Sequence, residues 1–367
     1  MAENDESAGA PPRARRARPP GLADVGRAAG VSYQTVWRVL NDSPRVSPAT
    51  RKRVLAAMEE LSYRPNPAAR ALVTGRSNTL GLVSHDPTLY GPACTQHAIE
   101  RTADDAGYLL TIVSMRSLDE RSLWNAVERL TLGGVAGVLV IVSERRAAQV
   151  IAKLDAGVPL VAVEAGPDHG VPVVAVDQRG GAEMATRHLL DLGHRTVHHV
   201  AGPKDSVEAR LRCEGWRQTL RDSGAAVTEP LRGDWSAGSG YDAGVRLLAD
   251  PAVTAVFVAN DQMALGMLRA VHEAGLQVPS DISIVGFDDT PESAYLVPPL
   301  TTIRQDFSVL GALALQVLIA EIDELPRDPR QPALVRPELL VRASTASPPA
   351  PAKRSRQLSS EQVEVSS

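Results

Sequence analysis

Side chains that can read DNA bases occur together near the N-terminus. Tyr33, Gln34 and Arg38 project from one face of a predicted helix over residues 33–40. In the major groove, a glutamine can form two hydrogen bonds with adenine and an arginine two with guanine. Three further side chains are placed to contact phosphates: Thr35, Arg51 and Arg53. The segment therefore predicts a surface that binds double-stranded DNA.

A second group of polar side chains lies far along the chain. Asn260 and Asp288 each fall at the C-terminal end of a predicted strand. Open α/β sheets bind their ligands at that end of their strands. Carboxylate, amide and guanidinium groups can satisfy the neighbouring hydroxyls of a sugar, because they accept or donate hydrogen bonds in pairs.

Catalytic chemistry is not indicated. The chain shows no set of nucleophile, base and orienting residue and no phosphate-binding loop, and His194, His198 and His199 lack metal-ligand spacing with carboxylates. A glycoside-processing enzyme stays as an alternative. It would need two carboxylates about 5–10 Å apart across a cleft, with Glu164 and Asp288 as the pair to test by replacement. No cofactor is expected.

The DNA-reading side chains need a small helical domain to hold them. Residues 22–29, 33–40 and 48–61 are predicted helices with apolar residues at three- and four-residue spacing. Gly30 ends the first, Ser32 caps the second, and Ser47 caps the third with Pro48 at its first position. The turn at 28–31 between the first two is typical of a helix-turn-helix.

Charge is distributed unevenly along the chain. Residues 1–70 carry 12 basic and 7 acidic residues, whereas the whole chain has a formal charge of −4. A basic N-terminal part on an acidic body is typical of a polyanion-binding module joined to a soluble regulatory domain. A solvated charge run is the simpler explanation for residues 13–18 alone, but the excess continues through the predicted helices.

From residue 78 on, short apolar strands alternate with helices, which predicts an α/β fold of parallel, doubly wound sheets. The chain is long enough to form two such lobes. The predicted strands are 80–85, 108–115, 138–142, 159–164, 173–177, 197–201, 255–260 and 282–288.

The segments LADVGRAAGVSYQTVWRVLN (22–41) and VSPATRKRVLAAMEELSYRPN (46–66) resemble the DNA-binding headpiece of the LacI family. The resemblance places Tyr33, Gln34 and Arg38 at base-reading positions. Trp37 stands where a known member of the family has a serine, so it could pack on the DNA backbone or shift the helix. NPAARALVTG (66–75) resembles the family's hinge helix, which implies DNA contacts by Asn66 and insertion of Leu72 into the minor groove.

The similarity continues to about residue 343, through the segments AGP (201–203), ARLRCEGW (209–216), GDWSAGSG (233–240), VANDQMALG (258–266), VGFDDT (285–290) and PPLTTIRQDF (298–307). It implies a two-lobed core like that of periplasmic binding proteins, with a sugar effector between the lobes. Residues implied at the effector site are Leu89, Glu164, Arg212, Trp235, Asn260, Asp288, Gln305, Phe307 and Leu310. Glu164, Val176 and Thr95 differ from the residues of that same member, which changes the depth of the site. A β-galactoside or related glycoside is the expected effector.

These features divide the chain into parts. We expect a disordered basic arm at 1–20, a helix-turn-helix domain at 21–65, a hinge at 66–77, the core at 78–343 and a disordered tail at 344–367. Within the core, residues 78–176 and 307–334 form the N-lobe, and residues 177–305 and 335–343 form the C-lobe.

The resemblance implies a homodimeric repressor that leaves a pseudo-palindromic operator when sugar binds. An activator stays as an alternative, and so does a secreted sugar-binding protein, although the chain shows neither a signal peptide nor a membrane-spanning run. Cys94 and Cys213 read as reduced thiols, which favours the cytoplasm.

Overall fold

The computed structural model describes residues 20–40, 43–63, 77–85, 88–115, 117, 119–142, 144–151, 154, 156–165, 170–326 and 332–350. The chain separates into two compact units, Met1–Ser77 and Asn78–Ser367. Residues 1–19 of the predicted arm, the hinge residues Asn66 and Leu72, and the part of the predicted tail beyond 350 lie outside the described residues.

The first unit contains three helices: α1 (Leu22–Ala29), α2 (Tyr33–Leu40) and α3 (Pro48–Glu60). The bounds of the first two agree with the prediction. Ser32 Oγ accepts from the Thr35 amide at 3.2 Å, and Ser47 Oγ accepts from the Thr50 amide at 3.2 Å. Both predicted caps are therefore present. The helices share a core of buried apolar side chains: Val25, Ala29, Val36, Val39, Val54 and Ala57.

The turn between α1 and α2 depends on two glycines. Gly30 has a φ of 64°, a left-handed conformation that glycine adopts without strain. A side chain on Gly26 would press against the carbonyl oxygen of Val31, 2.9 Å from the position of its Cβ. These small residues let α2 cross close to α1, as a helix-turn-helix requires.

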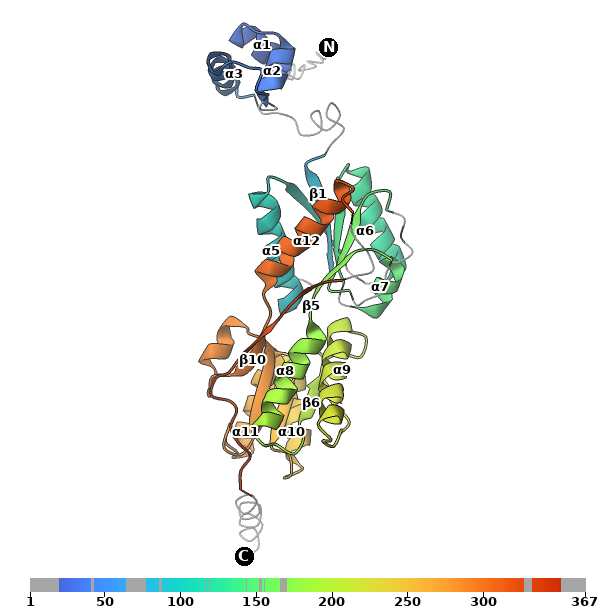
Figure 1. The fold of residues 1–367 in the computed structure, drawn as a ribbon, viewed down its shortest axis with the longest axis vertical. Helices are drawn as coiled ribbons and strands as arrows, with labels where there is room; N and C mark the ends of the chain where they lie inside the picture. The colour runs from blue at the N-terminus through green and yellow to red at the C-terminus, as the bar shows by residue number, and fades with distance from the viewer. Residues whose placement is uncertain are drawn as a thin grey trace, which may run out of the picture. The chain divides into compact units, whose positions relative to one another are not determined.

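The second unit begins with a three-layer N-lobe (Figure 1). Its six strands follow the order β11-β5-β4-β3-β1-β2, and all the pairs are parallel. Helices α5 (Tyr90–Asp105) and α12 (Phe307–Ile322) cover one face, and α6 (Glu120–Leu132) and α7 (Arg145–Ile151) cover the other. The strands are β1 (Thr79–His85), β2 (Leu109–Met115), β3 (Val138–Ile141), β4 (Leu160–Val163), β5 (Val173–Val176) and β11 (Ala333–Val335).

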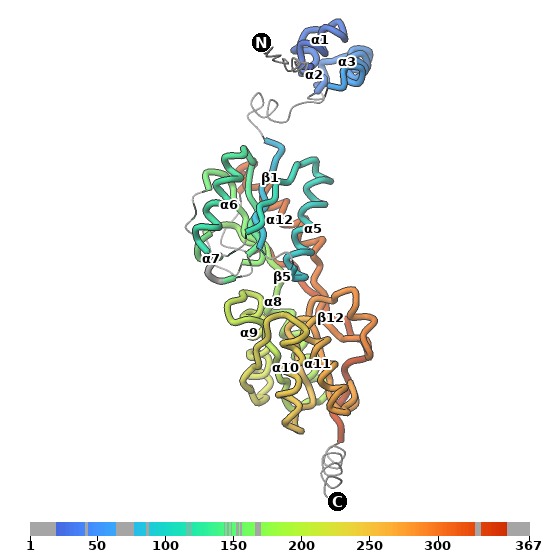
Figure 2. Tube along the Cα trace, turned by 180° about the vertical axis from the view of Figure 1, so that it is seen from behind, coloured from blue at the N-terminus to red at the C-terminus, as the bar shows by residue number. Residues whose placement is uncertain are grey.

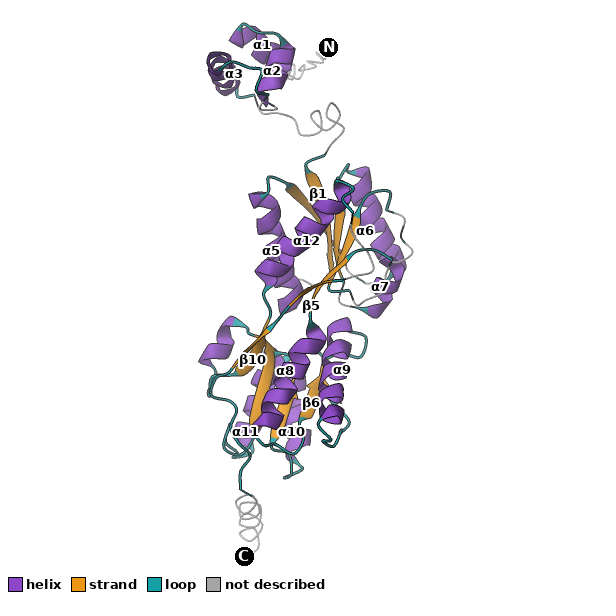
Figure 3. Ribbon diagram, in the orientation of Figure 1, coloured by secondary structure: helices purple, strands orange, loops and turns teal. Residues whose placement is uncertain are grey.

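The C-lobe repeats this architecture, as Figure 3 shows by secondary structure. Its sheet order is β12-β10-β9-β8-β6-β7, with only the β10–β12 pair antiparallel. Helices α8 (Gln178–Asp191) and α9 (Val207–Asp222) pack on one face, and α10 (Ala237–Leu248) and α11 (Asp261–Glu273) on the other. The strands are β6 (His198–Ala201), β7 (Leu231–Arg232), β8 (Ala255–Val258), β9 (Ser283–Asp288), β10 (Thr301–Arg304) and β12 (Glu338–Leu340).

The predicted fold class is confirmed, and the eight predicted strands are present with end points within two residues. The prediction missed four strands of two to four residues, β7, β10, β11 and β12. Such short strands carry little periodicity, and β11 and β12 pair only with distant parts of the chain.

The chain crosses between the lobes three times, after β5, after β10 and between β11 and β12. Figure 2 follows these crossings along the Cα trace. The ordered C-lobe also continues past the predicted boundary at 343. Ser344 is fully buried, donates to the Ile284 carbonyl and accepts from the Thr301 amide at 2.8 Å. The expected tail therefore begins too early, because these residues are held by contacts with strands far away in sequence.

Candidate functional site

A cavity of about 330 Å³ lies between the two lobes and is called the interlobe cavity below. Both sheets have the strand order of doubly wound folds, which places ligands at the carboxyl ends of the strands. The lining agrees with this rule: Leu89 follows β1, Glu164 follows β4, and Asn260 follows β8. Two further lining residues, Asp288 and Gln305, end β9 and follow β10.

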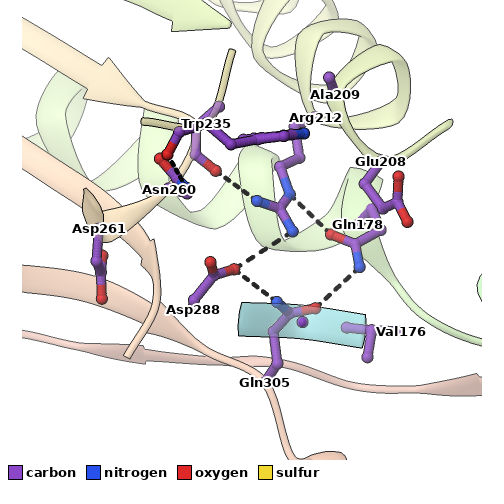
Figure 4. Close-up of polar contacts among 12 residues, drawn as sticks. Val176, Gln178, Glu208, Ala209, Arg212, Trp235, Asn260, Asp261, Asp288 and Gln305 are labelled. Carbon is purple, nitrogen blue, oxygen red and sulfur yellow. Dashed lines mark hydrogen bonds and ion pairs between the residues drawn. The ribbon is translucent and has the colours of Figure 1, made fainter. Parts of the chain in front are cut away.

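Arg212, on α9, is the centre of the polar network in Figure 4. Its Nε donates to Gln178 Oε1 at 2.8 Å, and its Nη1 donates to the Ala259 carbonyl. Its Nη2 lies 3.5 Å from Asp288 Oδ1, and both side chains are more than nine-tenths buried. The guanidinium also stacks on Phe287, 3.7 Å from the ring centroid. A buried charge is stable only with such partners, so Arg212 is fixed in one orientation.

Two glutamines connect Arg212 to the N-lobe side of the cavity. Gln305 Nε2 donates to Asp288 Oδ1 at 2.7 Å, and its Oε1 accepts from Gln178 Nε2 at 2.9 Å. Gln178 Nε2 also lies 3.3 Å from Glu164 Oε2. Because Gln178 and Gln305 adjoin crossing segments, this network joins the two lobes directly.

Burial raises the pKa values of the carboxyl groups around the cavity. Removal from water raises the pKa of Glu164 to about 8, and the nearby charge of Glu208 adds to this effect. Burial likewise raises the pKa of Asp288 to about 7, although the Arg212 guanidinium opposes it. Several titratable groups with raised pKa values in one cavity are typical of a functional site.

Backbone strain is concentrated in the same place. Glu164, Trp235 and Asp288 have φ values of 62°, 76° and 111°, which non-glycine residues rarely adopt. All three line the cavity. Strained conformations persist only where the surrounding structure imposes them, and they gather at binding sites.

Aromatic side chains form the apolar wall of the cavity. Trp235, Tyr90 and Phe307 line it, and the Tyr90 and Phe307 rings meet edge to face with centroids 5.9 Å apart. The indole of Trp235 packs closely over Gly202, where any side chain would overlap it. Flat apolar rings beside a hydrogen-bonding network suit a ligand with both an apolar face and hydroxyl groups.

The helical unit presents its own polar surface. Tyr33, Gln34 and Arg38 are exposed on α2, opposite its buried side chains Val36 and Val39. The helix is held from behind, so these three side chains are free of the domain core and available to a ligand. Such an arrangement is what insertion of a helix into a DNA groove requires.

Comparison with known proteins gives the family. The model of the family "Bacterial regulatory proteins, lacI family" matches residues 21–66, and that of the periplasmic binding protein-like domain matches residues 186–345. The lactose operon repressor of Escherichia coli K12 is 37% identical over 304 residues, covering 82% of this chain and 84% of the repressor. This chain belongs to the LacI family.

Two other similar repressors carry different names. The ribose operon repressor of Escherichia coli K12 is 34% identical over 88% of this chain and 99% of the repressor. A repressor named PurR from Pasteurella multocida is 34% identical over 89% of this chain and 98% of its own length.

Solved structures of similar regulators support the same family membership. The lac repressor dimer bound to operator and the anti-inducer ONPF has a TM-score of 0.81 at 36% identity, covering 90% of this chain and all of that one. The regulator CelR in complex with cellobiose has a TM-score of 0.66 at 31% identity, covering 89% and 99%. As a LacI-family protein, the chain is a DNA-binding transcriptional repressor with a sugar-binding domain and not an enzyme.

In this LacI-family repressor, the structure brings eight of the nine residues expected at the effector site to the interlobe cavity: Leu89, Glu164, Arg212, Trp235, Asn260, Asp288, Gln305 and Phe307. Leu310 is the exception. It is fully buried in the N-lobe core between α12 and the sheet, so its predicted role in the cavity wall is wrong. Helix α12 is apolar on nearly all sides, so the sequence does not show which side of it faces the core.

Asn260 lines the cavity, but its side-chain amide already forms hydrogen bonds within the protein. Its Oδ1 caps α11 by accepting from the Met263 amide at 2.9 Å, and its Nδ2 donates to the Trp235 carbonyl at 3.1 Å. It therefore positions the Trp235 loop as well as facing the ligand space.

The sequence reasoning missed several cavity residues, of which Gln178 and Glu208 belong to the polar side. Gln178 is 2% exposed and joins Arg212, Gln305 and Glu164. Glu208, in the first turn of α9, lines the cavity beside them. The position of Glu208 four residues before Arg212 was the available signal, because residues at that spacing share one face of a helix.

Arg51, expected to contact phosphate, also supports the helical domain from within. It is partly buried, and its guanidinium donates to the Val39 and Ser43 carbonyls at 3.3 and 3.4 Å. It thus holds the end of α2 against α3. Arg53 is exposed, and Thr35 and Trp37 are partly buried.

Among the described residues, no group of His, Cys, Asp or Glu is arranged to hold a metal ion. Cys94 and Cys213 are free thiols. Within the same residues, no helix is long and apolar enough to cross a membrane.

Proposed function

We propose that this repressor binds a pseudo-palindromic operator as a homodimer and is released when a sugar, a β-galactoside or related glycoside, occupies the interlobe cavity. The observation that carries the proposal is the buried network of Arg212, Asp288, Gln305 and Gln178 facing Trp235. Fixed donors and acceptors opposite an aromatic ring can bind the hydroxyls and the apolar face of a sugar.

The same network supports control of DNA binding by the sugar. Gln178 and Gln305 lie beside two of the three crossings between the lobes, and Phe307 begins α12 next to one of them. A ligand that bonds to these residues favours one angle between the lobes. Such coupling typically amounts to about 1–3 kcal/mol, a change of roughly 5- to 150-fold in affinity.

On the DNA side, we propose that Tyr33, Gln34 and Arg38 contact base edges. Thr35, Trp37, Arg51 and Arg53 contact the DNA backbone, Arg51 while also supporting α2. Asn66 and Leu72 of the hinge complete the interface. The exposed face of α2 supports the first part, and the lac repressor dimer bound to operator supports the arrangement as a whole.

The first test measures thermal unfolding of the full-length protein with a panel of mono- and disaccharides. An occupied cavity should raise the midpoint by several degrees for one class of sugar, because a ligand stabilises only the folded state. Asp288→Ala should abolish the shift. Asp242→Ala, an exposed carboxylate on α10, should retain it. No shift with any sugar would contradict the proposed effector.

The second test uses a duplex selected from random DNA by the protein itself. The stabilising sugar should weaken binding to this duplex by roughly 5- to 150-fold. Arg38→Ala should weaken it by about tenfold or more, as loss of a base contact does. Tighter DNA binding with sugar would overturn the proposed release, and an unchanged affinity of Arg38→Ala would remove Arg38 from the interface.

A further inference from the structure

Among the described residues that line the interlobe cavity, acidic side chains outnumber basic ones. Three acidic side chains from its inner lining, Glu164, Glu208 and Asp288, face it together. Arg212 is the one cation among the described residues that line it, and it already pairs with Asp288. Within the described part of the chain, Glu164 and Glu208 have no salt-bridge partner.

The hydrogen bonds of Glu164 come from neutral donors. Its Oε1 and Oε2 accept from the Val176 amide and from Gln178 Nε2, each at 3.3 Å. The side chain is 8% exposed, so water does not replace a missing counter-ion. A carboxylate in this environment gains strongly from any cation that enters the cavity.

Glu208 is held in place by its helix. Ser206 caps α9 and donates from Oγ to Glu208 Oε2 at 2.7 Å, which leaves the other carboxylate oxygen for a ligand. Figure 4 shows Glu208 beside Gln178, the residue that also contacts Glu164. Burial raises the pKa of Glu208 to about 7, and the negative charge of Glu144 adds to this effect. The charge of Glu208 in turn disfavours ionisation of Glu164.

The aromatic wall also favours a cation. Tyr90, Phe307 and Trp235 line the same space, and the face of an aromatic ring attracts a positive charge. The described part of the cavity therefore combines two carboxyl groups that form no salt bridge with three aromatic rings, and a neutral sugar would use these features only in part.

We propose that the effector is an amino sugar, a glycoside with a protonated amine bound by Glu164 and Glu208, and that Glu208 selects it over the neutral counterpart. The proposal rests on the sugar-binding function proposed above. Hydrogen bonds between charged groups are about twice as strong as neutral ones. We therefore expect the amino sugar to bind about tenfold or more tightly than its neutral counterpart.

Calorimetric titration of the full-length protein tests this with matched pairs of neutral and 2-amino sugars. The pairs are galactose with galactosamine, lactose with its 2-amino analogue, and cellobiose with the deacetylated glucosamine dimer. At least one amino sugar should bind about tenfold or more tightly than its partner. Glu208→Gln keeps the shape of the side chain and should remove this preference. Glu183→Gln, an exposed carboxylate on α8 outside the cavity, should keep it.

The outcomes separate the two proposals. If neutral sugars bind as tightly as their amino partners, or more so, the amine proposal is overturned while the sugar-binding function stands. If neither kind binds, both proposals fall. Should Glu208→Gln fail to fold, the comparison of pairs on the unmodified protein still decides between these results. A preference that survives in folded Glu208→Gln would remove Glu208 as the selecting residue.

Discussion

At the level of single residues, the buried carboxyl groups make stability depend on pH. The pKa of Glu164 rises from its ordinary value of 4.5 to about 8 in the folded protein. The folded state therefore binds the proton more tightly than the unfolded chain does. The stability that Glu164 contributes is fully present below about pH 4.5 and is lost as the pH rises through about 8.

Replacing Glu164 with glutamine should remove this dependence. Without ligand, the midpoint of thermal unfolding of the unmodified protein should fall more between pH 5 and pH 8.5 than that of Glu164→Gln. The buried His199 affects both proteins equally, because burial lowers its pKa to about 3 in a lobe core away from the substitution. Calorimetric scans at several pH values would measure the difference, and parallel curves would show that Glu164 titrates normally.

At the level of elements, the close contact of α10 and α11 sets the position of the cavity wall. Trp235 precedes α10 and Asn260 caps α11, so a shift of either helix moves a lining residue. Gly240 and Gly266 allow the approach. A methyl group at Gly266 would overlap the Ala237 carbonyl oxygen, and one at Gly240 would overlap the Met263 backbone.

Gly266→Ala should therefore destabilise the protein by about 1–3 kcal/mol or more, as overpacking does, and should weaken effector binding. Gly238→Ala on α10 is the matched control. Its added methyl group meets only Ser236 Oγ at 3.8 Å, and alanine has the higher helix propensity, so its stability should be unchanged or higher. Unfolding in denaturant measures the stability of both variants. Equal stability of the two variants would refute the role assigned to this contact.

At the level of the whole molecule, the proposed control of DNA binding must be reciprocal. If sugar lowers operator affinity by some factor, operator must lower sugar affinity by the same factor, since both follow from one coupling free energy. Titrating sugar into the protein with and without saturating operator duplex should give that factor. Unequal factors would mean that the two ligands do not act through one pair of states.

Local features explain what the sequence could predict. The helices α1 and α2 have the predicted bounds because caps, turn glycines and apolar spacing act within a few residues of one another. The eight strands were visible because each is an apolar run with clear ends. Eight cavity residues followed from the family resemblance.

From the sequence alone, the helix-turn-helix, the two α/β lobes and eight residues of the interlobe cavity could be predicted. The tertiary structure alone decided the strands β7, β10, β11 and β12, the burial of Ser344, and the placement of Leu310 in the core. It also showed that Glu208 lines the cavity and that, among the described residues, Glu164 and Glu208 form no salt bridge. The physical reason is distance along the chain: pairing, burial and charge balance depend on residues that only folding brings together.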